Sequence, residues 1–134
     1  MCILRINLKE STMLILGIES SCDETGLALY SEDEGLIAHM VNSQVELFTE
    51  YGGVIPEIAA RDHSVKIINI LKTLLKKADK NLHDINLVAY TAGPGLIGSL
   101  MVGETVAKTI SNILDIELLP INHLEGHILA PGLE

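Results

Sequence analysis

Short runs of apolar residues, separated by polar turns, divide the first part of the chain into three predicted strands. Residues 14–19 form a mostly apolar run that predicts a buried strand, and residues 26–30 predict its hairpin partner. Residues 36–42 predict a third strand after the polar turn at residues 31–35. We therefore expect these strands to form an antiparallel meander.

From about residue 56 to about residue 80, apolar positions recur every three to four residues, which predicts an amphipathic helix. Its apolar face is formed by Ile67, Ile68, Leu71, Leu74, Leu75 and Ala78. The opposite face is polar and carries Lys66, Asn69, Lys72, Lys76 and Lys77. These lysines are most simply a solvated helix face.

The second half of the chain alternates between strand and helix patterns. Residues 86–90 predict a strand, residues 91–99 a loop, residues 100–114 a helix and residues 116–121 a fifth strand. Alternating strands and helices imply parallel pairing in this part of the sheet. The order βββαβαβ predicts an α/β fold with a mixed sheet and flanking helices. It is the layout of one ribonuclease-H-like lobe of the actin and sugar-kinase type ATPase fold.

The composition supports one domain. The chain has 134 residues, of which 48% are hydrophobic, and a mean hydropathy of +0.36. This is enough for one buried core and too little for a second domain. We assign residues 13–134 to the lobe and residues 1–12 to an N-terminal extension. The extension either adds an edge strand or reflects a start codon placed upstream of Met13.

Targeting signals and charge narrow the function class. No apolar run reaches the length of a membrane span, and the start of the chain lacks the order of a secretory signal, so we expect a cytoplasmic protein with no membrane partner. Cys2 and Cys22 lack paired spacing and are expected to be reduced thiols. The net charge of -9 opposes binding of a polyanion by this chain alone, so nucleic-acid contact requires another chain.

The most informative motif lies near the C-terminal end, where His123 and His127 are four residues apart. In a helix they share one face, so both imidazoles can point at a single ion or phosphate. Divalent metals at catalytic sites generally need three or more protein ligands, so at least one must come from elsewhere. The alternative is that one histidine flanks a short helix and the other lies at a surface.

The same motif argues against a metalloprotease. In such enzymes the glutamate directly follows the first histidine, where it faces the metal-bound water. Here Leu124 occupies that position, and Glu125 lies about 200° around the helix from His123. Peptide hydrolysis by that mechanism is therefore disfavoured.

Two loops could hold an anion. The loop from Ser20 to Gly26 brings hydroxyl and carboxylate groups close together, and in a lobe of this type the first hairpin points at nucleotide phosphates. An ordinary polar turn is the alternative. The glycine-rich loop at residues 92–99 opens a helix, so Gly93 and Gly95 would let a ligand approach free N–H groups. A tight strand-to-helix connection explains that loop almost as well.

A further turn precedes the long helix. Residues 52–57 include two glycines, and Pro56 lies near the first helical turn, where the missing N–H has little effect. Arg61 and His63 follow early on this helix. They could reach a ligand, although a lone arginine and histidine in such positions are more often surface residues.

Four motifs in this order identify a family resemblance. The chain resembles the universal tRNA threonylcarbamoyladenosine transferase family in its bacterial form, through the segments GIESSCDET at 17–25, GGVIPE at 52–57, TAGPGLIG at 91–98 and NHLEGH at 122–127. The resemblance covers essentially residues 13–134. The same family was formerly labelled O-sialoglycoprotein endopeptidase, a label that the position of Glu125 makes chemically unattractive.

The resemblance implies an acyltransferase. A threonylcarbamoyl group would move from threonylcarbamoyl-adenylate to the exocyclic amine of the adenosine beside the anticodon, in tRNAs that read ANN codons. The family fold is two actin-like lobes with a metal and substrate in the cleft between them. The implied partners are tRNA, bound through a multiprotein complex, a paralogous non-catalytic subunit and an ATPase subunit.

The resemblance also assigns residues. His123 and His127 would be two ligands of a divalent metal, with iron (Fe2+) expected and zinc or magnesium as alternatives. Asp23 and Glu24 would be catalytic, with Glu24 orienting the substrate or the attacking amine. Substrate-binding groups are expected in both loops, at Ser20, Ser21, Gly93 and Gly95.

The chain departs from the family pattern in length. It stops at Glu134, so we expect the second lobe, a glycine-rich substrate loop and the aspartate that supplies the third metal ligand to be absent. We therefore expect weak or no activity from this polypeptide alone. The alternatives are a non-catalytic module that docks to a partner, or a degenerate fragment of the transferase, and a metalloendopeptidase is less favoured.

Overall fold

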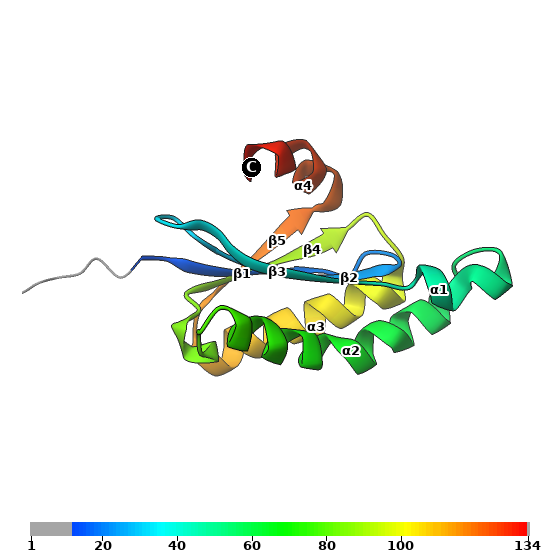
Figure 1. Ribbon diagram of the computed structural model, residues 1–134, viewed down its shortest axis with the longest axis horizontal. Helices are drawn as coiled ribbons and strands as arrows, with labels where there is room; N and C mark the ends of the chain where they lie inside the picture. The colour runs from blue at the N-terminus through cyan, green and yellow to red at the C-terminus, as the bar shows by residue number, and fades with distance from the viewer. Residues whose placement is uncertain (1–11, 134) are drawn as a thin grey trace, which may run out of the picture.

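The computed structural model describes residues 12–133, which form one five-stranded mixed sheet with helices packed against it (Figure 1). The predicted extension, Thr12 excepted, and Cys2 within it lie outside the described residues. The strands are β1 (Leu14–Glu19), β2 (Glu24–Ser31), β3 (Gly35–Ser43), β4 (Leu87–Gly93) and β5 (Glu117–Asn122). The helices are α1 (Val45–Phe48), α2 (Pro56–Lys77), α3 (Ile97–Leu114) and α4 (His123–Leu129), with short 3-10 turns at Thr49–Tyr51, Leu82–Asp84 and Ala130–Leu133.

The sheet has the pairing that the sequence predicted. Its strand order is β3-β2-β1-β4-β5. The first three strands form the antiparallel meander, while β1 with β4 and β4 with β5 are parallel. This arrangement confirms the predicted α/β order and places the carboxyl ends of three parallel strands side by side at one edge of the sheet.

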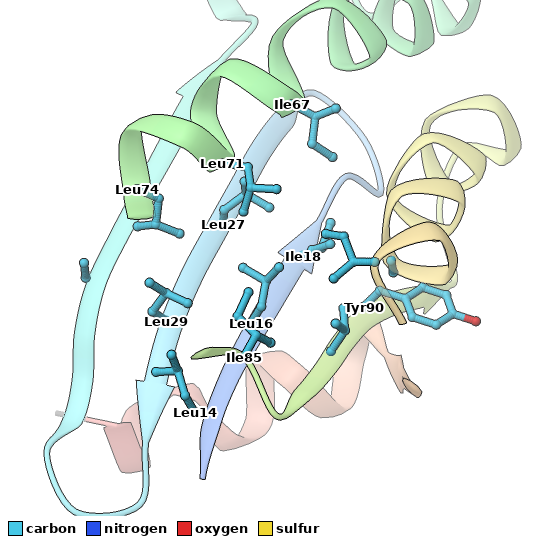
Figure 2. Packing of buried hydrophobic residues seen from close by; sticks show 14 residues of the cluster. Leu14, Leu16, Ile18, Leu27, Leu29, Ile67, Leu71, Leu74, Ile85 and Tyr90 are labelled. Atoms are coloured by element: carbon cyan, nitrogen blue, oxygen red, sulfur yellow. The ribbon is translucent and has the colours of Figure 1, made fainter. Parts of the chain in front are cut away.

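The core lies between the sheet and the two long helices, which run side by side on one face of the sheet (Figure 1). Alternation along β1 directs Leu14, Leu16 and Ile18 into this core, as a half-buried strand requires. Figure 2 shows side chains of the strands meeting those of α2, with the buried residues Leu16, Leu27, Leu29, Ile67, Leu71 and Leu74 among them. The apolar stripe predicted for the long helix is therefore the surface that packs on the sheet, except at Ile68, which is 44% exposed.

The helix ends differ from the sequence prediction for local reasons. Helix α2 ends at Lys77, three residues earlier than predicted, because Asp79 adopts a left-handed conformation with φ of 53°. Helix α3 begins at Ile97, directly after Leu96, whose N–H binds a carbonyl of the β1–β2 loop. Within the residues that the structure describes, no helix is long and apolar enough to cross a membrane.

Candidate functional site

A cleft of about 490 Å³ opens at the carboxyl ends of the parallel strands. In open α/β sheets, ligands generally bind at this end of the strands. Strand β1 contributes Glu19, β4 contributes Thr91 and β5 contributes Asn122. Strand β5 also contributes Ile121, and the remaining lining comes from the β1–β2 hairpin and from α4, through Ser21, Cys22, Asp23, Glu24, His123, Gly126 and His127.

The histidine pair is placed by the start of α4. The Asn122 side-chain oxygen accepts hydrogen bonds from the N–H groups of Leu124 (2.9 Å) and Glu125 (3.4 Å), which makes it the N-cap of this helix. Helical geometry then stacks His123 and His127 on one face, as predicted for a helical segment. Their Nε2 atoms are 3.0 Å apart, and their rings are nearly perpendicular at 83°.

This separation fits two ligands of one metal ion. For metal–nitrogen distances of about 2.0–2.1 Å, a gap of 3.0 Å between the Nε2 atoms gives an angle of about 91–97° at the metal. That angle is closer to the 90° of an octahedral site, roughly, than to the tetrahedral value of about 109°. Within residues 12–133, no group of three or more His, Cys, Asp or Glu side chains could hold a metal. The described residues thus bring together two imidazoles, fewer than the three or more ligands that a catalytic metal site generally needs.

Glu19 orients the first histidine from behind. Its Oε2 is 3.4 Å from Nδ1 of His123, and Ser21 Oγ is 3.1 Å from the same nitrogen. A proton held on Nδ1 by these oxygens leaves Nε2 of His123 unprotonated, so that it can accept a hydrogen bond from His127 Nε2 or bind a cation. This is the carboxylate–histidine pair that commonly fixes a metal-binding imidazole.

The surroundings of Glu19 keep it ionised. Burial raises the pKa of the Glu19 carboxyl, but hydrogen bonds from Ser21 and Thr91, together with the nearby His123, outweigh burial and lower the pKa below its usual value. The Ser21 N–H donates to Oε1 at 2.6 Å, and the Thr91 hydroxyl donates to Oε2. Glu19 is therefore a fixed negative charge at the base of the cleft.

The charge of the cleft favours a cation. Glu19, Asp23 and Glu24 supply three carboxylates, and the described lining residues include no lysine or arginine. A negative pocket next to two imidazoles attracts a divalent ion or an amine and repels a free phosphate. A phosphate-bearing substrate would need its charge offset by a bound cation.

The predicted substrate-binding residues are placed differently from one another. Ser21 lines the cleft, whereas Ser20 is buried beneath it, where its hydroxyl donates to the Ser99 carbonyl (2.8 Å) and accepts from the Gly103 N–H (3.1 Å). Gly93 pairs with Asn122 at the end of the sheet. Of the four predicted substrate-binding residues, Ser21 alone lines this cleft. The roles of all four remain predictions.

Gly95 packs against Ser21, a residue of the cleft lining. A Cβ atom built there would lie 2.5 Å from the Ser21 carbonyl oxygen and 2.8 Å from the Ser21 Cβ. The Leu96 N–H donates to that same carbonyl at 2.8 Å. The glycine lets the β4–α3 loop touch the backbone of the β1–β2 hairpin.

Glu19 and Thr91 are residues of the cleft lining that the sequence reasoning missed. Glu19 is the last residue of β1, and Thr91 follows Tyr90 on the neighbouring parallel strand β4, so the two side chains meet at the same end of the sheet. A carboxylate as the last residue of one predicted strand, together with a threonine directly after another predicted strand, is the signal that could have found them.

One expectation is wrong. His63, which like Arg61 was expected at the surface, is fully buried at 0% exposure. Its imidazole binds Thr25 Oγ1 and the Cys22 carbonyl, both of which belong to the hairpin above α2. Arg61 is exposed and pairs with Glu57 at 2.7 Å.

Comparison with known proteins identifies the family. Residues 35–134, three quarters of the chain, match the sequence model of TsaD, tRNA N6-adenosine threonylcarbamoyltransferase. The chain belongs to this family. The resemblance carried by the four sequence motifs is thereby confirmed, and membership of a tRNA-modifying transferase family with it.

Solved structures support the fold. The chain is similar to YeaZ from Pseudomonas aeruginosa, with a TM-score of 0.65 and 15% identity over 82% of this chain. It is also similar to a protein from the same organism described as uncharacterised with similarity to peptidase YEAZ, with a TM-score of 0.63, 18% identity and the same coverage. These likenesses confirm the lobe of the actin-like ATPase type. The chain spans 43% of the length of each of these two structures.

Proposed function

We propose that this TsaD-family lobe supplies the metal-holding wall of a threonylcarbamoyl transferase site. The reaction would transfer the threonylcarbamoyl group of threonylcarbamoyl-adenylate to N6 of the adenosine beside the anticodon, in tRNAs reading ANN codons. The observation that carries the proposal is the pair of Nε2 atoms 3.0 Å apart in an acidic cleft, in a chain of this family. The lobe would act together with a second lobe that completes the cleft.

The histidines would bind the metal, and the carboxylates would handle the amine. His123 and His127 would be two ligands of a divalent ion, with iron expected, and Glu19 would keep His123 aligned. When bound, such an ion acts as a Lewis acid that polarises the substrate carbonyl and offsets phosphate charge. Asp23 and Glu24, which line the same cleft, would face the incoming adenine.

The transfer step is an acyl substitution. N6 of the adenosine attacks the carbamoyl carbon, a C–N bond forms, and the C–O bond to the adenylate phosphate breaks. AMP leaves with the bonding electrons, and the Glu24 carboxylate takes the proton that the amine loses. An exocyclic adenine amine is a weak nucleophile, so alignment by a hydrogen bond to Glu24 contributes through proximity and general base catalysis.

The charge of the chain supports a shared tRNA site. With a net charge of -9, this chain alone does not attract a polyanion. We propose that tRNA binds through a multiprotein complex that includes a paralogous non-catalytic subunit and an ATPase subunit. A purely docking role for this chain is less favoured, because the aligned histidine pair and its Glu19 support have no use in docking.

A peptidase function has less support from the geometry. Glu125 does not line the cleft around His123 and His127, so it is not placed to activate a water molecule between them. The side chain behind His123 is Glu19, whose oxygens are already bound by Ser21 and Thr91. That carboxylate is an orienting group and not a free general base.

A reconstituted transfer assay tests the proposal. The chain is combined with the second lobe that completes the cleft, the other proteins of the complex, threonylcarbamoyl-adenylate made with radiolabelled threonine, and an ANN-reading tRNA. Label in the modified nucleoside is then measured by chromatography after digestion. We expect His123→Ala and His127→Ala each to abolish label transfer.

His83→Ala is the matched control, since His83 is an exposed histidine outside the cleft. It should transfer label at the wild-type rate. Undiminished transfer by both cleft variants would refute the assignment of the histidines. Absence of transfer by the wild type in the complete mixture would refute the proposed reaction.

A further inference from the structure

His63 uses both ring nitrogens inside the protein. Its Nδ1 is 2.6 Å from Thr25 Oγ1, and its Nε2 is 2.8 Å from the carbonyl oxygen of Cys22. Both His63 and Thr25 have an exposed fraction of 0%. The two short hydrogen bonds to one hairpin, in addition to the packing of a buried side chain, hold this imidazole in one orientation.

The partners fix the tautomer. A carbonyl oxygen only accepts hydrogen bonds, so Nε2 of His63 carries a proton and donates it to Cys22. In the neutral ring Nδ1 is then the acceptor, and the Thr25 hydroxyl donates to it. The ring thus connects helix α2 to the loop between β1 and β2 in one defined orientation.

That loop, residues 20–23, is tied down one residue at a time. Ser20 is held by α3 through its hydroxyl, and the Ser21 carbonyl accepts from the Leu96 N–H. The Asp23 carbonyl accepts from the Gln44 N–H at 2.9 Å. The Cys22 carbonyl lies between these two anchors and accepts from His63.

The same loop forms one wall of the cleft. Ser21 places its hydroxyl 3.1 Å from Nδ1 of His123, and Cys22 and Asp23 line the cleft beside it. A shift of the Cys22 peptide would turn Ser21 and Asp23 together, because each is one residue away. A functional site has to hold its groups within about 0.5 Å of the productive geometry. The hydrogen bond that fixes the Cys22 carbonyl therefore affects the geometry of the site.

We infer that His63 is a positioning residue for this site: through the Cys22 carbonyl it sets the orientation of the Ser21–Asp23 wall against the histidine pair. It touches neither substrate nor metal and acts from beneath the loop. The inference about catalysis rests on the proposed function. The inference about loop position does not.

Two amide substitutions separate the two hydrogen bonds. In His63→Gln, the side-chain amide nitrogen reaches the position of Nε2 and keeps a donor for the Cys22 carbonyl. In His63→Asn, the amide reaches only the position of Nδ1, so it keeps a partner for Thr25 and leaves Cys22 without a donor. Both variants remove the same ring, and they differ from each other by one methylene group.

The loop position is read by hydrogen exchange. The N–H groups of Leu96 and Gln44 bind the carbonyls on either side of Cys22 and report directly on loop opening. We expect both amides to exchange faster in His63→Asn than in His63→Gln, while amides in the middle of β1 exchange alike. Equal exchange in the two variants would overturn the positioning role.

Catalysis is read in the complete transfer mixture. We expect His63→Asn to lower kcat on the order of 10- to 100-fold with little change in KM for tRNA, and His63→Gln to restore most of it. Equal kcat values in the two variants, with stability reduced in both, would show that His63 acts only as a core residue. If the wild type transfers no label, the proposed reaction fails, and the exchange comparison still decides the position of the loop.

A measurement on the wild type covers the case in which His63→Asn does not fold. Long-range proton–nitrogen NMR correlation on histidine-labelled protein distinguishes the two ring nitrogens. We expect a protonated Nε2 and an unprotonated Nδ1 in His63. A ring protonated only at Nδ1 could not donate to Cys22 and would overturn the inference.

Discussion

Replacing Gly95 with alanine tests how tightly the β4–α3 loop is packed against the site. The added Cβ would lie 2.5 Å from the Ser21 carbonyl oxygen, whereas real Cβ atoms essentially never come within 3.0 Å of another atom. The two backbones therefore have to separate by at least about 0.5 Å, which is the tolerance of a functional site. The contacting atoms are mainly backbone, so no side-chain rotation relieves the overlap.

The separation has a predictable energetic effect. Overpacking of this kind destabilises by about 1–3 kcal/mol. Stretching the bond from the Leu96 N–H to the Ser21 carbonyl, now 2.8 Å, adds about 0.5–1.5 kcal/mol if that bond is lost. We expect Gly95→Ala to lower the free energy of unfolding by about 1–4 kcal/mol. The change is measured by urea denaturation.

Gly53→Ala is the matched control, since nothing lies within 4 Å of the Cβ position at Gly53 and its backbone needs no left-handed conformation. Alanine there should leave stability unchanged or raise it by about 0.4–1 kcal/mol, through a less flexible unfolded chain. If Gly95→Ala and Gly53→Ala differ by less than about 0.5 kcal/mol, the close packing of loop and hairpin is not real.

Three further outcomes are expected. Glu19→Gln should weaken zinc binding by about 10- to 100-fold in calorimetric titration, because it removes the carboxylate behind His123, and unchanged affinity would exclude that orienting role. In metal-free protein, the lowered pKa of Glu19 gives stability that is present above the ordinary glutamate pKa of about 4.3 and is lost as the pH falls through the lowered value. The Tm of the wild type should therefore fall more than that of Glu19→Gln from about pH 5 to about pH 3, and parallel curves would contradict this. Leu16→Ala removes a fully buried side chain and should lower the free energy of unfolding by about 2–5 kcal/mol, as measured by urea denaturation. Leu36→Ala, at a position that is 41% exposed, should lower it far less. Equal losses in the two variants would show that the core lies elsewhere.

The sheet could be predicted from the sequence because its strands carry strong local signals. The prediction for β1 has the observed bounds, since Leu14, Leu16 and Ile18 alternate with residues on the other face. The parallel part followed from the alternation of strand and helix patterns. The short helix α1 was missed because four residues are too few to show a helical period.

The candidate site could be predicted only in part, because its sides come from distant segments. The histidine spacing and the acidic hairpin are local patterns, and the structure brings both to one cleft. Glu19 and His123 are separated by 104 positions, and their contact depends on the parallel order of β1, β4 and β5. The burial of His63 was not predictable, because its partners lie on another element, 38 and 41 residues away.

The most direct test of the two-histidine centre is a zinc titration followed by histidine NMR. Zinc serves as a diamagnetic probe, and the described part of the chain offers five histidines to compare: His39, His63, His83, His123 and His127. We predict that the Nε2 signals of His123 and His127 shift together at one equivalent of zinc, while those of the other three stay unchanged. Binding that leaves these two signals in place, or shifts the other histidines instead, would contradict the account.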